Sequence, residues 1–147
     1  MLHLIKNLSD SFFQFLSEDP VRPNIPHVDR IGDHKDIFVL RGDDGSVTAI
    51  TCVSYQSSIP TTEGELFQVS EQPDAAVFYT IWSYKPGAGR QLIFESVKYI
   101  KDNKPYISRF VTLSPKTEMA RKFHLKNGAI VFRENGETVN YEYVSGQ

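Results

Sequence analysis

The chain contains a single cysteine, Cys52, among its 147 residues. A lone cysteine excludes an intramolecular disulfide and a cluster of thiolate metal ligands. Because Cys52 lies between Thr51 and Val53 in an apolar run, we expect it to pack in the core, where free cysteine behaves as a small hydrophobic residue. The histidines and carboxylates between His27 and His34 match the spacing of no established metal site, so we predict no bound metal.

Long hydrophobic runs and clusters of basic residues are also absent. No segment approaches the ~18 consecutive apolar residues of a membrane-spanning helix, and no cleavage site typical of an export signal follows the first residues. The 16 Lys and Arg residues are scattered among 18 Asp and Glu residues, and the net charge is −2. Nucleic-acid binding requires a basic stripe, which this distribution does not provide. We therefore expect a cytoplasmic protein that binds neither a membrane nor nucleic acid.

The remaining composition is ordinary for a globular domain. Hydrophobic residues make up 40%, aromatic residues 12% and charged residues 23% of the chain, as is typical of folded proteins. A chain of this length buries about two-thirds of the surface that it exposes when unfolded. No internal repeat, low-complexity tract or linker interrupts it. We predict one domain over residues 1–147.

Hydrophobic periodicity predicts an α/β chain. Helices are expected at 5–19, 90–103 and 116–126, with Ser114 as N-cap, Pro115 at the first helical position and Asn127 with Gly128 at the end of the third. Strands are expected at 37–40, 47–55, 75–82, 107–113, 129–133 and 138–144. The Asp-Gly and Asn-Gly pairs at 44–45 and 135–136 predict hairpins. The run 75–82 is continuously apolar and should be the central strand, whereas 20–36 should be a loop or a short helix over the active face.

The turn after the central strand carries the most specific signal. It reads Tyr84, Lys85, Pro86, Gly87, Ala88, Gly89 and leads into the second predicted helix. Glycines let the backbone approach a ligand without a Cβ in the way, and the N-terminus of the helix directs free N–H groups and a positive dipole end at that ligand. We therefore predict a phosphate-binding turn. The alternative is that these residues only form a turn and bind no ligand.

Two better-known phosphate loops do not fit this turn. A Walker loop is excluded, because no lysine and hydroxyl pair follows either glycine at the required spacing. A dinucleotide fingerprint places a third glycine or alanine where Leu92 stands, and an acid at the end of the next strand, where Leu113 and Ser114 stand. A phosphate site at this turn would therefore be of another kind.

The order of elements and this turn together resemble the GCN5-related N-acetyltransferases (GNAT), as a divergent member. The hallmark of that family, Q/R-x-x-G-x-G/A after a central strand, is matched at its glycines, with Tyr84 in place of the leading Gln or Arg. The family motif N-x-x-A-x-x-L-Y-E-K-x-G-F is similar here in Thr117, Ala120, Phe123, His124, Leu125, Lys126, Gly128 and Ala129. The resemblance implies a mixed, mostly antiparallel twisted sheet of about six to seven strands flanked by helices.

The resemblance also implies where acetyl-CoA is bound. In that family it lies between the central strand and the one that follows, with its pyrophosphate on the glycine-rich turn. Carried over, the backbone of Ile81, Trp82 and Ser83 pairs with the pantetheine arm and the acetyl carbonyl. The other residues expected to contact the cofactor are Lys85, Gly87, Ala88, Gly89, Arg90, Gln91 and Thr117.

His124 occupies the position of the tyrosine that, in this family, often protonates the departing thiolate. A histidine can donate a proton near neutral pH because its ordinary pKa is about 6.5. In the alternative interpretation, His124 is a partly exposed residue near a helix C-terminus, where a cation is favoured. No residue is assigned as the general base.

The resemblance thus implies an acetyl-CoA-dependent N-acetyltransferase that acts on a primary amine of a small molecule or a protein. The alternative is a non-catalytic domain of the same fold that binds CoA or a protein partner, because Tyr84, Thr117 and His124 replace preferred residues. The acceptor cannot be read from the sequence, and a homodimer is one candidate assembly.

Overall fold

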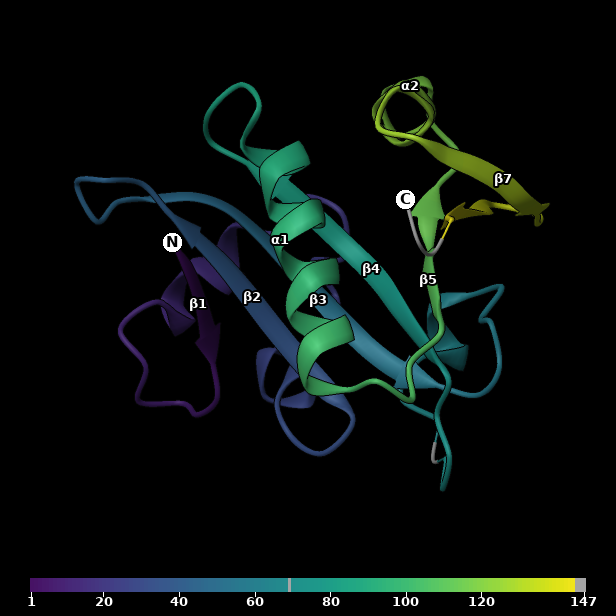
Figure 1. Cartoon of the computed structure of the whole chain (residues 1–147), viewed down its shortest axis with the longest axis horizontal. Helices are drawn as coiled ribbons and strands as arrows, with labels where there is room; N and C mark the ends of the chain where they lie inside the picture. Colours follow the sequence, from purple (N-terminus) through teal and green to yellow (C-terminus); the bar gives the residue numbers. More distant parts are fainter. Residues whose placement is uncertain (69, 145–147) are drawn as a thin grey trace.

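The computed structural model describes residues 1–68 and 70–144 (Figure 1). Helices α1 and α2 and the short 3-10 helices η1 to η3 alternate with eight strands. In chain order the elements are β1 (Leu2–Ile5), η1 (Phe13–Glu18), η2 (His27–Arg30), β2 (Lys35–Arg41), β3 (Val47–Gln56), η3 (Glu63–Glu65), β4 (Ala75–Ser83), α1 (Ala88–Asn103), β5 (Arg109–Thr112), β6 (Ser114–Pro115), α2 (Glu118–Lys126), β7 (Ala129–Glu134) and β8 (Thr138–Tyr143).

All the strands belong to one sheet in the order β1-β2-β3-β4-β5-β8-β6, with β7 paired to β8. Within the part of the chain that the structure describes, only the pair β4 and β5 is parallel, and the other pairs are antiparallel. The predicted mixed, mostly antiparallel sheet is confirmed, and so is the central place of the strand predicted at 75–82. In the described residues the sheet has eight strands, whereas the resemblance implies six or seven. The strands that the sequence does not predict are β1 and the two-residue β6.

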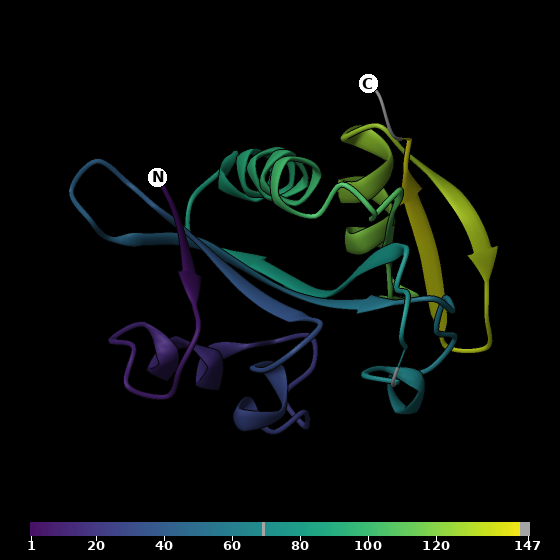
Figure 2. The ribbon, with the colours of Figure 1, turned by 60° about the horizontal axis from the view of Figure 1, so that its bottom comes forward.

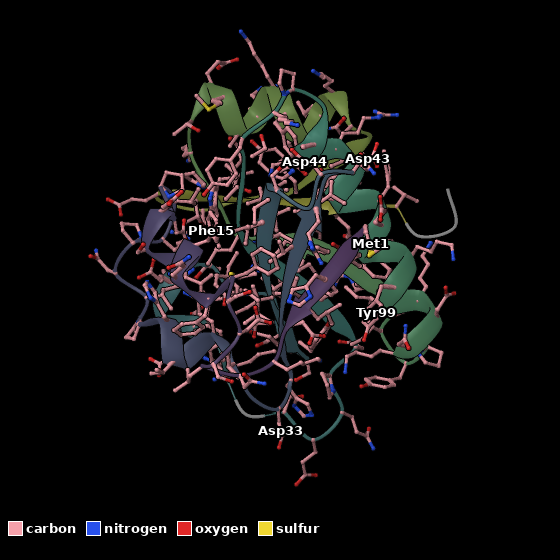
Figure 3. The ribbon with its side chains drawn as sticks, turned by 90° about the vertical axis from the view of Figure 1, so that its left-hand side faces the viewer. Met1, Phe15, Asp33, Asp43, Asp44 and Tyr99 are labelled. Atoms are coloured by element: carbon pink, nitrogen blue, oxygen red, sulfur yellow. The ribbon has the colours of Figure 1, made fainter. Side chains whose placement is uncertain are left out.

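The two faces of the sheet are covered by different parts of the chain (Figure 2). Helix α1 lies on one face and buries Leu92, Ile93 and Ile100 there, as its periodicity predicts. The segment that carries η1 and η2 lies on the opposite face. Figure 3 shows Phe15 of that segment and Tyr99 of α1 on opposite sides of the strands. Each face therefore has its own apolar core.

The helix predicted at 5–19 is wrong. Residues Leu2–Ile5 instead pair with β2, and a 3-10 helix forms only at Phe13–Glu18. Between them, Asp10 accepts a hydrogen bond from the backbone N–H of Phe12 and stabilises a turn. The apolar spacing that suggested one helix belongs to two elements, because Ile5 and Leu16 reach the same core from a strand and from a 3-10 helix.

The start of the third predicted helix also needs correction. Ser114 and Pro115 are not its N-cap and first turn, because they pair with β8 as strand β6. Thr117 is the N-cap of α2, and its side chain accepts a 3.2 Å hydrogen bond from the backbone N–H of Ala120. The predicted end is confirmed, since Gly128 follows the helix with a φ of 99°.

Segment 20–36 contains the 3-10 helix η2, in line with the short helix or loop expected there. Cys52 is fully buried, as predicted. Within residues 1–68 and 70–144, no helix has the length and apolar character needed to cross a membrane. No group of three or more His, Cys, Asp or Glu side chains in these residues is arranged to hold a metal ion.

A buried ion pair fixes the N-terminal segment to the sheet. Asp19 accepts a 2.7 Å hydrogen bond from Nη1 of Arg30, and both side chains are 0% exposed. The other carboxylate oxygen of Asp19 accepts from the hydroxyl of Thr80 in β4 and from the backbone N–H groups of Val21 and Arg22. The charge is therefore paired and surrounded by donors, as a buried carboxylate requires.

Replacing Asp19 with alanine should lower the free energy of unfolding by about 3–5 kcal/mol, because it leaves the Arg30 guanidinium buried without its counterion. Lys98→Ala, which removes the exposed pair Lys98–Asp102, is the control and should change stability by less than about 0.5 kcal/mol. Urea denaturation followed by circular dichroism measures both. Equal effects of the two substitutions would show that the buried pair does not hold the segment in place.

Candidate functional site

The central feature of the site is the point at which β4 and β5 part. Their parallel pairing runs from Ala75 with Arg109 to Phe78 with Thr112. One further hydrogen bond, from the N–H of Leu113 to the carbonyl of Phe78 at 3.0 Å, is the last between these two strands in the described residues. Beyond it, β4 continues to Ser83, while the segment that follows β5 turns away and pairs with β8 as β6. The end of β4 therefore has no strand partner on this side.

A β-bulge in β4 lies at this point. Cys52 of β3 is opposite Thr80, but the next residue, Val53, is opposite Phe78, so Tyr79 is an extra residue in β4. A bulge bends its strand and increases the local twist. The bulge therefore turns the end of β4 away from β5 and widens the opening between them.

A pocket of about 370 Å³ occupies this opening. Five of the residues predicted to bind the cofactor line it, namely Ile81, Trp82, Ser83, Gly89 and Thr117, and so does His124, the predicted catalytic residue. Sequence reasoning missed the others that complete the wall, among them Pro20, Val21, Phe78, Leu113 and Phe123. No local motif marks Pro20, Val21, Phe78 and Leu113, because they reach the pocket only through the packing of separate elements. Phe123 belongs to the motif of the third predicted helix, but the motif gives it no role in the site.

The predicted residues Lys85, Gly87, Ala88, Arg90 and Gln91 lie beside the pocket, in the turn and the first turn of α1. Two of their backbone N–H groups are engaged, from Ala88 to the carbonyl of Lys85 and from Gln91 to the carbonyl of Gly87, both at 3.2 Å.

The remaining N–H groups of this turn are available. Among the described residues, nothing accepts a hydrogen bond from the N–H groups of Gly87, Gly89 and Arg90. The N-terminus of α1, a helix of 16 residues, thus presents unpaired donors and the positive end of its dipole. Such an arrangement suits an anion.

The two glycines of the turn are needed for different reasons. Gly87 has a φ of 80°, a left-handed conformation that strains residues with a Cβ. Gly89 has ordinary backbone geometry, but an added Cβ would lie 3.0 Å from the ring of Phe123 on α2. Gly89 therefore allows α1 and α2 to approach each other beside the pocket.

Tyr84, which stands where the family hallmark has Gln or Arg, links the turn to the N-terminal segment. Its hydroxyl donates to the carboxylate of Glu18 and accepts a 3.0 Å hydrogen bond from Nε1 of Trp82. Its ring contacts Phe15 edge-on, with 6.3 Å between ring centroids. This tyrosine therefore positions η1 next to the end of β4.

His124 is buried, with 3% of its surface exposed, so the interpretation of it as a partly exposed helix residue is wrong. Its Nδ1 is 2.7 Å from the hydroxyl of Tyr143, and its ring stacks on Tyr141 with 5.0 Å between centroids. Burial lowers the pKa of His124 from 6.5 to about 4. The ring is therefore neutral at pH 7.

The neutral ring can still donate a hydrogen bond. Burial raises the pKa of Tyr143, so its hydroxyl keeps its proton and can donate to Nδ1 of His124. In that tautomer Nε2 carries the ring proton. Because Nδ1 is paired and His124 lines the pocket, Nε2 is the nitrogen left to face a bound ligand.

Comparison with known proteins supports the fold alone. No family model matches the chain, and no curated protein matches its sequence. Malonyl-CoA decarboxylase from Rhodopseudomonas palustris is similar in structure, with a TM-score of 0.77 and 18% identity over 99% of this chain and 60% of that chain. GCN5 from Tetrahymena has a TM-score of 0.66 and 14% identity over 100% of this chain and 98% of that chain.

A third similar structure is the Campylobacter jejuni N-acetyltransferase PseH in complex with acetyl coenzyme A, with a TM-score of 0.65 and 13% identity over 99% of this chain and 100% of that chain. The chain spans between 35% and 60% of the malonyl-CoA decarboxylase chains that it matches. The chain has the GNAT fold, as the sequence resemblance implies.

Gly89→Ala should lower the free energy of unfolding by about 1–3 kcal/mol, because its Cβ would overlap the ring of Phe123. Gly136→Ala, whose Cβ would meet no atom within 4 Å, should leave stability nearly unchanged. Chemical denaturation compares the two. Adding Phe123→Leu to Gly89→Ala should recover part of the loss, and failure to do so would contradict this packing explanation.

The stability of the protein should depend on pH through His124. With a pKa of about 4 when folded and 6.5 when unfolded, the unfolded chain binds the proton first as the pH falls. Its contribution is therefore fully present above pH 6.5 and lost towards pH 4, a change of about 3 kcal/mol. Denaturation curves between pH 7 and pH 4 should show this loss. The His124→Gln variant can still bond Tyr143 but cannot titrate, so an equal loss in that variant would assign the effect to other groups.

Proposed function

We propose that this chain, which has the GNAT fold, binds acetyl-CoA in the opening between β4 and β5 and transfers the acetyl group to a primary amine. The observation that carries the proposal is the position of the pocket, which lies between the parted strands and beside a turn with unpaired N–H groups. A CoA thioester has a long, largely apolar arm and a pyrophosphate, and these two halves match the pocket and the turn.

The pyrophosphate is assigned to the turn before α1. The N–H groups of Gly87, Gly89 and Arg90 supply donors, and the side chain of Lys85 adds an exposed positive charge. Ala88 and Gln91 flank these donors, but their own N–H groups are used within the turn and the helix. Of the donors that the sequence resemblance implies, the N–H of Gln91 is thus already engaged.

The pantetheine arm is assigned to the free edge of β4. Backbone groups of Ile81, Trp82 and Ser83 pair with its amides, as an added strand would. Thr117 and the apolar residues of α2 form the opposite wall. In this placement the thioester lies at the inner end of the pocket, near Tyr79 and Leu113.

For catalysis, the amine nitrogen attacks the thioester carbonyl carbon and loses one proton to water, the carbon–sulfur bond breaks, and the sulfur departs as a thiolate. Because His124 is neutral, its Nε2–H stabilises the developing negative charge on sulfur by a hydrogen bond, and solvent delivers the proton that completes the thiol. Donors aimed at a developing charge are effective in a site that excludes water. This role replaces the general acid expected from the sequence.

A second candidate function is a non-catalytic domain that binds CoA or a protein partner. It is favoured by the inner end of the pocket, where Pro20 and Val21 form part of the wall. These residues follow the buried carboxylate of Asp19, which anchors them to β4. A segment held in this way restricts the approach of an acceptor amine from that face of the sheet.

Acetyl-CoA should stabilise the protein against heat. A ligand at 100 times its dissociation constant adds about 2.7 kcal/mol to the free energy of unfolding, which differential scanning fluorimetry detects as a rise in Tm. Gly87→Asp and Gly87→Asn form a matched pair, because both side chains tolerate a left-handed backbone and only aspartate repels a pyrophosphate. The shift should persist in Gly87→Asn and disappear in Gly87→Asp.

The absence of any shift at millimolar acetyl-CoA would overturn both the enzyme and the CoA-binding alternative. Where a shift is seen, release of free thiol from acetyl-CoA with a panel of primary amines separates them, because a non-catalytic domain releases none. Malonyl-CoA is tested separately by release of CO₂, since a structurally similar protein is a malonyl-CoA decarboxylase and decarboxylation leaves the thioester intact and frees no thiol. The His124→Phe variant tests the role assigned to Nε2, because phenylalanine has no N–H donor, and unchanged turnover would remove His124 from the mechanism.

A further inference from the structure

Arg22 joins the two strands at the point where they part. Its Nε donates a 3.1 Å hydrogen bond to the carbonyl of Tyr79 in β4, and its Nη2 donates a 2.8 Å hydrogen bond to the carbonyl of Leu113 after β5. These two carbonyls lie immediately beyond the last direct bond between the strands, from Leu113 to Phe78. Two acceptors cannot bond to each other, so the guanidinium takes the place of the missing ladder bond.

The shape of the guanidinium makes this contact specific. Its N–H donors lie in one plane as a rigid fork, and Arg22 uses Nε and Nη2 together on the two carbonyls. The fork therefore sets the separation of Tyr79 and Leu113, and with it the width of the opening at its inner end. A lysine ammonium has no such fixed geometry.

Arg22 is itself held firmly. It is 9% exposed, its backbone N–H donates to the carboxylate of Asp19, and its carbonyl accepts a 2.8 Å bond from Nη2 of Arg30. Its remaining terminal nitrogen, Nη1, lies 3.6 Å from the carboxylate of Glu63. The buried pair Asp19–Arg30 thus fixes the backbone that presents the fork.

We infer that Arg22 is a positioning residue for the thioester end of the bound CoA ester. This inference rests on the proposed function, which assigns the thioester to the inner end of the pocket. Tyr79 and Leu113 line that end, and Arg22 acts on the ligand through their carbonyl groups. In the described residues, no hydrogen bond or ion pair joins Arg22 to the turn before α1, so we expect its influence to be restricted to the pantetheine half of the ligand.

The test compares two ligands on the variants Arg22→Lys and Arg22→Gln. Calorimetry gives the dissociation constants of acetyl-CoA and of adenosine 3′-phosphate 5′-diphosphate, the nucleotide half that carries the pyrophosphate. Affinity for acetyl-CoA should fall about tenfold, because the variants lose the hydrogen bonds by which Arg22 positions the two carbonyls, and the net contribution of one hydrogen bond corresponds to about this factor. Affinity for the nucleotide half should stay within about twofold.

Arg133→Lys is the matched control. Arg133 also donates a 2.8 Å bond to a backbone carbonyl, that of Ile59, but it does not line the pocket. Both affinities should be unchanged in this variant. Gly87→Asp provides the opposite control, because its carboxylate should weaken both ligands.

Three results overturn the inference. Equal losses for both ligands would show that Arg22 acts through general stability, and no loss for either would show that the fork does not position the ligand. Restoration of acetyl-CoA affinity by Arg22→Lys, relative to Arg22→Gln, would assign the effect to charge and not to the fork. If the unmodified protein binds neither ligand, the proposed function itself fails, which is a separate and distinguishable outcome.

Discussion

The structure depends on the buried ion pair between Asp19 and Arg30. Removing two charges from water is costly, and the cost is offset only when the geometry of the pair is good and further hydrogen bonds surround it. Asp19 meets this demand with the hydroxyl of Thr80, a side chain of the central strand. The pair therefore ties an otherwise irregular segment to β4, and it places Pro20, Val21 and Arg22 beneath the opening of the sheet.

That opening has a simple physical origin. A bulge at Tyr79 turns β4, and the short β6 draws the chain after β5 towards β8. Each change removes ladder hydrogen bonds, and the groups left without partners must be satisfied in another way. Arg22 satisfies two carbonyls at the inner end. The remaining edge of β4 faces the pocket, which is where we assign the ligand.

The fold could be predicted from the sequence where the pattern is local. The apolar run at 75–82, the glycine-rich turn and the periodicity of Leu92, Ile93 and Ile100 are short-range signals, and the structure has a central strand, a turn and a helix there. The prediction of an N-terminal helix is wrong, because Ile5 and Leu16 follow a helical period by chance and belong to two different elements. Ser114 and Thr117 are both suitable N-caps, and only pairing with β8 decides between them.

The sequence by itself determined that a glycine-rich turn leads into a helix. The structure has Gly87 in a left-handed backbone conformation there, and α1 begins at the next residue. The tertiary structure alone decided the state of His124, because its neutral ring results from burial beside Tyr141 and Tyr143 and not from its neighbours in the chain. It also decided that Arg22 donates a hydrogen bond to the carbonyl of Tyr79, more than 50 residues away along the chain. Desolvation and hydrogen bonding across such separations arise only when the chain is folded, so no local pattern records them.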